Sequence, residues 1–93
     1  MDLKELRTEI DKVDDELIGL FFKRLSIAGD IALYKKQHGL PVFDPKREEE
    51  KLSALSAKVN EEYKEQIVKF FSLLFNISRA EQEKILSSGE AVQ

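Results

Sequence analysis

The segment "LKELRTEIDKVDDELIGLFFKRLSIAGDIALYKKQ", residues 3–37, decides the fold of this 93-residue chain. It contains no proline, and its apolar residues recur at steps of three, four and seven. That spacing is typical of one face of an amphipathic helix. The sequence therefore predicts one uninterrupted helix from about Leu3 to Gln37. Its apolar residues include Leu6, Ile10, Val13, Leu17, Leu20, Ile27, Ala28 and Ile31.

The predicted length of this helix has a consequence for assembly. About 35 residues at ~1.5 Å each give a rod of roughly 50 Å. A compact chain of this size has a radius of gyration of only about 12–13 Å. The rest of the chain cannot easily cover the whole apolar face of such a rod. We therefore expect oligomerisation, most simply as a two-fold homodimer.

The stretch "GLPVFDPKREEE", residues 39–50, ends the first helix and begins a second. Gly39 and Pro41 break the helical pattern. Asp44 is a strong N-cap, because its carboxylate accepts hydrogen bonds from the free N–H groups of the first turn. Pro45 suits the first helical position, where a missing N–H is no loss. We expect the second helix to run from Asp44 to about Lys58, with Leu52 and Leu55 as its apolar positions.

A third helix is expected from about Glu61 to Leu86, with Asn60 as a candidate cap and Gly89 at or beyond its end. Residues 87–93 are expected to be a frayed tail. No strand-like alternation appears in the sequence. The prediction is an all-α single domain, residues 1–93, with a long, a short and a long helix. The broad apolar face of the third helix contains Ile67, Phe70, Phe71, Leu74, Phe75, Ile77 and Ile85.

Composition excludes several classes of function. Hydrophobic residues make up 42% and charged residues 35%, which suits a soluble, helix-rich protein. The net charge of −3 argues against a nucleic-acid-binding surface. The absence of cysteine excludes disulfides, thiolate zinc sites and a cysteine nucleophile. No apolar run approaches the ~20 residues of a membrane span. Because the start "MDLKELRTEI" resembles no signal peptide, we expect a cytoplasmic location.

Four polar residues interrupt the apolar faces of the long helices. Arg24 and Lys35 are 11 residues apart, close to three turns, so they point the same way. Ser78 and Gln82 lie on the apolar line of the third helix. Taken singly, each has an ordinary explanation: the cations could extend to water along their stems, Ser78 could bond a helical carbonyl, and Gln82 could sit at an edge. Together they favour a polar, anionic ligand between the helices, because unpartnered polar groups are unfavourable in a dry core.

Arg7 lies on a similar line near the start of the first helix. It is 28 residues from Lys35, which corresponds to roughly 42 Å of helix. The two side chains cannot touch the same small ligand from one chain. If Arg7 serves the site, it must come from a second copy, and a dimer then has two sites.

The remaining motifs carry weaker signals. His38 is the only histidine and has no cysteine or histidine partner, so we expect no metal site. The acidic runs at 14–16 and 48–50 are typical of solvated helix faces. Glu48 is the exception, since it follows Arg47 in a turn that the cap holds in place. The sequence contains no glycine-rich phosphate loop, Ser/His/Asp set or nucleotide-binding fingerprint.

Four separated segments of the chain resemble the all-helical chorismate mutases. They are "LRTEIDKVDDELIGLFFKR" (6–24), "IAGDIALYKK" (27–36), "GLPVFDPKREEE" (39–50) and "SRAEQ" (78–82). The resemblance implies conversion of chorismate to prephenate, the committed step towards phenylalanine and tyrosine. It also implies an intertwined homodimer of three helices per chain, with two sites and with no metal or cofactor.

The resemblance also implies a set of site residues. Arg7, donated across the dimer, and Arg24 would bind the substrate carboxylates, since the guanidinium fork matches both oxygens. Lys35 and Gln82 would donate hydrogen bonds to the ether oxygen, where negative charge grows in the transition state. Glu48, together with the Asp44 backbone, would bind the substrate hydroxyl. Ser78 would bind a carboxylate, and Arg47 would support the turn and the anion.

Two alternatives remain open from the sequence. Isochorismate-pyruvate lyases look similar and also catalyse a pericyclic reaction on a related dicarboxylate. The chain could instead be a regulatory or interaction subunit for a larger shikimate-pathway enzyme. The glutamine, the Arg47-Glu48 turn and the close overall match favour the mutase over the lyase, and the complete set of expected site residues argues against an inactive module. A partner enzyme of that pathway could still activate the chain.

Overall fold

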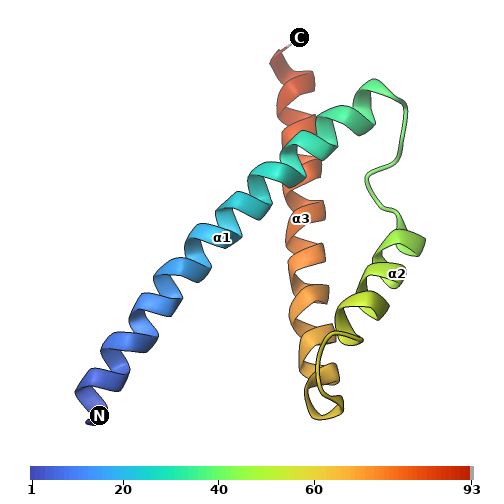
Figure 1. Cartoon of the computed structure of the whole chain (residues 1–93). Helices are drawn as coiled ribbons and strands as arrows, with labels where there is room; N and C mark the ends of the chain where they lie inside the picture. The colour runs from blue at the N-terminus through green and yellow to red at the C-terminus, as the bar shows by residue number, and fades with distance from the viewer. Residues whose placement is uncertain (93) are drawn as a thin grey trace.

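The chain folds into three α-helices and one short 3-10 turn (Figure 1). The computed structural model describes residues 1–92, and the side chains of residues 1–87. Helix α1 spans Leu3–Gln37, α2 spans Pro45–Ser56, the 3-10 turn η1 spans Glu61–Tyr63, and α3 spans Lys64–Val92. No strand occurs within residues 1–92. The predicted all-α class and the long, short, long order of the helices are confirmed.

Local chemistry explains both ends of α1. The Asp2 side chain accepts a hydrogen bond of 2.8 Å from the Glu5 backbone N–H, which satisfies a free donor of the first turn. At the other end, Gly39 adopts a left-handed φ of 65°. This conformation lets the Leu40 N–H donate back to the Lys35 carbonyl at 2.8 Å, and a side chain would disfavour it. The predicted bounds of α1 are confirmed.

The ends of α2 and α3 match the prediction less closely. Asp44 caps α2 as expected, since its carboxylate accepts from the Arg47 backbone N–H at 3.1 Å. Helix α2 stops at Ser56, short of Lys58. Asn60 lies at the N-cap of η1 but makes no side-chain cap hydrogen bond, and α3 starts only after this 3-10 turn. Helix α3 also continues past Leu86 and Gly89 to Val92, so the predicted end was wrong.

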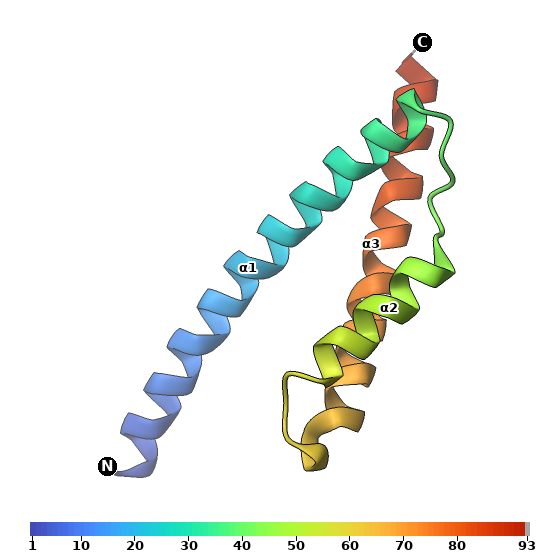
Figure 2. The same cartoon turned by 45° about the vertical axis from the view of Figure 1, so that its right-hand side comes forward.

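Helix α1 crosses α3 near the C-terminal end of α1, and α2 lies alongside α3 (Figures 1 and 2). The crossing is built from small residues. Ala28 and Ala32 are buried, and a Cβ added to Gly29 would lie 2.8 Å from the Ile85 Cδ1 atom. Small side chains thus allow the two helices to approach closely. Helices α1 and α3, together with α2, enclose a cavity.

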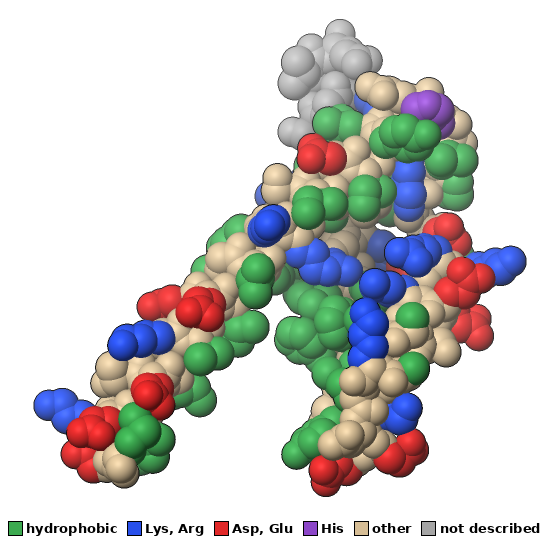
Figure 3. Space-filling view, viewed as in Figure 1, with side chains coloured by type: hydrophobic (Ala, Val, Ile, Leu, Met, Phe, Trp, Pro, Cys, Tyr) green, Lys and Arg blue, Asp and Glu red, His purple; other side chains and the backbone are tan. Residues whose placement is uncertain are grey.

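The N-terminal half of α1 diverges from the other helices and packs against neither of them (Figure 2). All side chains of residues 1–20 are exposed, including large apolar ones such as Leu6, Ile10, Val13 and Leu17. The radius of gyration is 16.9 Å, well above the ~12–13 Å of a compact chain of this length. Hydrophobic side chains follow the side of this arm that faces α3 (Figure 3).

None of the helices described in residues 1–92 combines the length and the apolar character that a membrane span requires.

Candidate active site

The three helices enclose a cavity of about 320 Å³, here called the central cavity. Its walls come from the C-terminal half of α1, the connection before α2, the first turns of α2 and the middle of α3. The lining residues are Arg24, Ile31, Lys35, Val42, Asp44, Arg47, Glu48, Lys51, Phe75, Ser78, Arg79 and Gln82. Seven of the eight predicted site residues are therefore brought together, all except Arg7.

Arg24 lies on the α1 wall and points across to α3. Its Nη1 donates a hydrogen bond to the Ser78 Oγ. Its guanidinium carbon lies 5.4 Å from the centre of the Phe75 ring, within the range of a cation–π contact. These two contacts fix the direction of the guanidinium group, whose fork offers more donors than the Ser78 hydroxyl can accept.

Lys35 lies in the last turn of α1, about three turns beyond Arg24. Its Nζ donates to the Val42 carbonyl oxygen at 2.8 Å. This bond holds the connection 38–44 against the end of α1, and the side chain is partly buried. Since an ammonium group has three donors, the Val42 bond leaves two for a ligand.

The capped turn of α2 forms the wall opposite α1. Asp44 stabilises this turn through its cap hydrogen bond, and Arg47 and Glu48 follow in it. The Glu48 carboxylate pairs with the Arg79 guanidinium of α3 at 3.2 Å. The two side chains are 24% and 28% exposed, so this pair is screened by water less than a surface pair.

Ser78 and Gln82 lie one helical turn apart on α3, and both are buried, at 8% and 7% exposure. Ser78 accepts the Arg24 hydrogen bond. The Gln82 Oε1 atom is buried and finds no partner among the described residues. A buried polar atom without a partner destabilises a fold by about 1–3 kcal/mol. A ligand that donates to this oxygen, or one that accepts from the NH2 group after the amide turns over, would remove that penalty.

The lining of the central cavity is strongly cationic. Five cations and two carboxylates line it, which gives a formal charge of +3, although the whole chain carries −3. The cations are Arg24, Lys35, Arg47, Lys51 and Arg79. The charge is therefore concentrated at one place on an acidic protein. Such a site favours a small ligand with more than one negative charge.

Arg7 lies outside the central cavity, on the exposed N-terminal arm of α1. This placement agrees with the spacing argument that one chain cannot bring Arg7 and Lys35 to the same ligand. Arg7 is too far from the central cavity of its own chain to contact a ligand there.

Sequence reasoning missed two charged residues of the lining, Lys51 and Arg79. Lys51 follows Asp44 by seven residues and Glu48 by three, so the helical period of α2 could have revealed it. Arg79 gives no such signal, because it follows Ser78 directly and lies off the line that joins Ser78 to Gln82. Only the packing of α3 against α2 brings its long side chain to Glu48.

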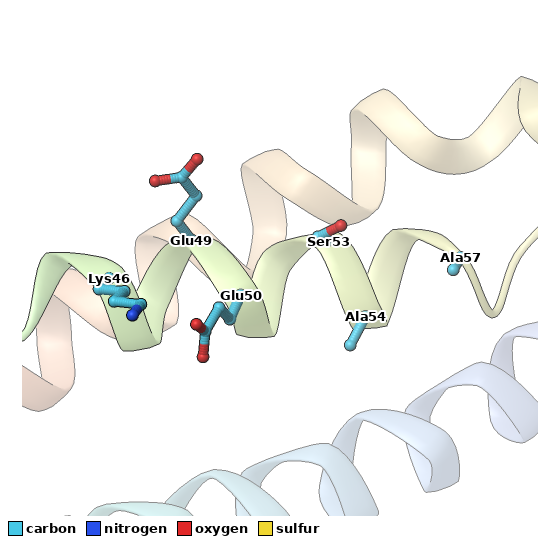
Figure 4. Close-up of a pocket in the computed structure, with 6 residues that line it drawn as sticks. All are labelled: Lys46, Glu49, Glu50, Ser53, Ala54 and Ala57. Atoms are coloured by element: carbon cyan, nitrogen blue, oxygen red, sulfur yellow. The ribbon is translucent and has the colours of Figure 1, made fainter.

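Two other hollows differ from the central cavity in chemistry. A depression on α2 is lined by residues of that helix and its cap alone, and Glu49 and Glu50 point in different directions there (Figure 4). An apolar cleft of about 660 Å³ lies where α1 and α3 diverge, with Leu17, Phe21 and Phe71 among its lining residues. Neither of them gathers polar groups around one point.

Comparison with known proteins gives matches along most of the chain. A family model described as chorismate mutase type II matches residues 6–83. The chorismate mutase of Methanocaldococcus jannaschii is 34% identical over 88 residues, which cover 90% of this chain and 87% of that protein. A crystal structure of chorismate mutase from Helicobacter pylori in complex with prephenate is 43% identical, with a TM-score of 0.82, and the match covers 91% of this chain and 93% of that one.

A shorter match is to the T-protein of Haemophilus influenzae, which is 54% identical over 46 residues. Those residues are 50% of this chain but only 12% of the T-protein, so the chain corresponds to a small part of that relative. The family model, in contrast, spans most of the chain and includes every residue that lines the central cavity. The chain belongs to the chorismate mutase type II family.

Proposed function

We propose that this chain is a chorismate mutase, which rearranges chorismate to prephenate on the route to phenylalanine and tyrosine. The observation that carries the proposal is the central cavity, where seven residues expected from the family resemblance surround a space with a lining charge of +3. Similarity to the chorismate mutase of Methanocaldococcus jannaschii and to a Helicobacter pylori enzyme that binds prephenate supports the choice of substrate.

The reaction asks little covalent chemistry of the protein. The ether C–O bond breaks while a new C–C bond forms in one cyclic movement of electrons, and no proton leaves or enters. Chorismate must adopt a folded, chair-like conformer in which the two reacting carbons meet. The site accelerates the step by holding that conformer and by stabilising the charge that develops as the ether bond breaks.

Arg24 and Ser78 bind one carboxylate of the substrate. They already form a hydrogen-bonded pair from two different helices, so their geometry is fixed before the ligand arrives. The remaining guanidinium donors of Arg24 suit a planar carboxylate.

Lys35 and Gln82 stabilise the ether oxygen. Lys35 keeps two N–H donors free of its bond to Val42. Gln82 carries a terminal amide at the cavity wall whose oxygen lacks a partner. Rotation about the last side-chain bond presents the amide NH2 group in its place. The Gln82 amide donates without any change of protonation.

The capped turn of α2 binds the other end of the substrate. Glu48 accepts a hydrogen bond from the ring hydroxyl, together with the Asp44 backbone. Arg47 contributes positive charge near the anion and supports the turn. The Asp44 cap, which holds the Arg47 N–H at 3.1 Å, keeps this wall in place without the ligand.

The working enzyme in this proposal is a homodimer with two sites. The apolar arm of α1 and the cleft between α1 and α3 offer a continuous surface for a second copy. Arg7 of one copy then reaches the central cavity of the other and binds the second carboxylate. Activation by a further shikimate-pathway enzyme and a cytoplasmic location stay predictions.

The direct test is the loss of chorismate absorbance with the purified chain, in EDTA and without added cofactor. Formation of prephenate supports the proposal. The same protein is then given isochorismate. Release of pyruvate and salicylate from it, by a protein that forms no prephenate from chorismate, would favour a lyase. Absence of both activities in a helical, dimeric sample would favour a subunit that needs another enzyme.

A further inference from the structure

Arg79 was assigned no role above, although it is one of the most connected side chains at the central cavity. Its Nη1 pairs with the Glu48 Oε1 at 3.2 Å, and its Nη2 donates to the Asn76 Oδ1. Its guanidinium carbon lies 4.5 Å from the centre of the Phe43 ring. One side chain of α3 thus contacts the first turn of α2 and the connection that precedes it.

These contacts engage both terminal nitrogens of the guanidinium group with protein atoms. Two of the five N–H donors of Arg79 are thus used within the protein, whereas Arg24 uses one among the described residues. Its charge acts mainly on Glu48. The pair is about three-quarters buried, where opposite charges at this distance interact more strongly than at the surface.

We propose that Arg79 is a specificity residue, which offsets the charge of Glu48 so that this end of the cavity accepts a neutral hydroxyl and disfavours an ammonium group. The inference rests on the proposed function, in which Glu48 meets the ring hydroxyl. An ionised carboxylate accepts a hydrogen bond from either group. A substrate ammonium at that position would also lie near the Arg79 cation, and like charges repel.

The proposal is tested with two substrates at pH 7: chorismate, and its analogue with an amino group in place of the ring hydroxyl. The measured quantity is the ratio of kcat/KM for the amino substrate to kcat/KM for chorismate. In Arg79→Met we expect this ratio to rise at least about tenfold, equivalent to about 1.4 kcal/mol. Arg79→Lys keeps the charge, so its ratio should stay within about threefold of the wild type.

Two further variants make the result readable. Arg79→Gln removes the charge but keeps a hydrogen-bond donor, so it should raise the ratio as Met does and replaces the Met variant if that protein misfolds. The matched control is Lys69→Met on the same helix, which removes a cation paired with Glu65 at 3.1 Å on the surface. Its ratio should equal that of the wild type, because that pair is mostly exposed and outside the cavity.

A purely structural role of Arg79 would lower kcat/KM for both substrates by the same factor. If the wild type converts chorismate but the ratio of kcat/KM values is unchanged in folded Arg79→Met and Arg79→Gln, the inference is overturned. Failure of the wild type to convert chorismate would overturn the proposed function, and this inference with it.

Discussion

Removal of the Lys35 ammonium group is the sharpest perturbation of the proposed mechanism. Lys35→Ala deletes the donor that we assign to the ether oxygen, and also the 2.8 Å bond to the Val42 carbonyl. The neighbouring residue supplies a matched control. Lys36 lies in the same last turn of α1 but does not line the central cavity. Lys36→Ala therefore removes the same charge from the end of the helix without touching the site.

The expected loss of activity follows from the role of the group. Removal of one donor to a developing oxyanion typically lowers the rate by about 10²–10³-fold, or about 2.7–4 kcal/mol. We expect kcat/KM of Lys35→Ala to fall at least 10²-fold and that of Lys36→Ala to stay within about twofold of the wild type. The charge effect at the helix end, about 0.3–1 kcal/mol in stability, is common to both variants and cancels in the comparison.

The bond to Val42 adds a second, smaller effect. A hydrogen bond of this kind contributes about 0.5–1.5 kcal/mol to stability. Lys35→Ala should thus lower the free energy of unfolding by about 1 kcal/mol more than Lys36→Ala. Urea titration followed by circular dichroism measures this difference, at one fixed protein concentration because the proposed enzyme is a dimer.

The assay is the initial rate of chorismate loss, with helix content and oligomeric state checked for each variant. A folded Lys35→Ala protein that retained more than a tenth of the wild-type kcat/KM would refute the assignment of Lys35 to the ether oxygen. An equal loss in both variants would point to the charge of the helix end instead.

The Gln82 amide donates at any pH, so kcat/KM of the wild type should change little between pH 5 and 7.5. Gln82→Glu should be active mainly at acid pH, where its carboxyl group is protonated. A steep loss of wild-type activity over this range would contradict the role of Gln82. Ile10→Asp should convert the proposed dimer to monomers in sedimentation experiments and abolish turnover, because it places a charge on the apolar arm. Lys12→Asp lies on the opposite side of α1, so it should leave the proposed dimer intact. Gly29→Ala should change the free energy of unfolding by less than about 1 kcal/mol, because the end of the flexible Ile85 side chain can move and alanine favours the helix. Gly29→Leu should lower it by about 1–3 kcal/mol through overpacking, as measured by urea titration. Equal stability of these two variants would mean that α1 and α3 do not approach closely there.

The sequence was most informative where a single helix face or cap determines the structure. Helix α1 was predicted with its observed bounds because it lacks proline and is followed closely by Gly39, whose positive φ marks the turn. The end of α3 was missed because a glycine weakens a helix by only about 1 kcal/mol, so Gly89 does not stop it. The 3-10 turn at Glu61–Tyr63 has no sequence signal as clear as the Asp44-Pro45 cap.

The site could be predicted as far as its residues lie on regular lines along a helix. Arg24 and Lys35 interrupt one apolar face, and Ser78 and Gln82 another, so their meeting in one cavity was expected. Arg79 could not be found in this way, because its contact with Glu48 depends on how α2 packs on α3. A residue that acts through contact with a neighbouring helix can be identified only once the packing of that helix is known.

Helix α1 is uninterrupted from Leu3 to Gln37, and this continuity constrains how the chain can evolve. One end of the helix carries Lys35 to the central cavity of its own chain, and the other end carries Arg7 to the site of a second copy in the proposed dimer. Insertion of a single residue between them would turn Arg7 by about 100° and shift it by about 1.5 Å relative to Lys35. Substitutions on the polar side of the helix leave that relation intact. The segment between Arg7 and Lys35 is therefore fixed in length, and only its polar side is free to vary in sequence.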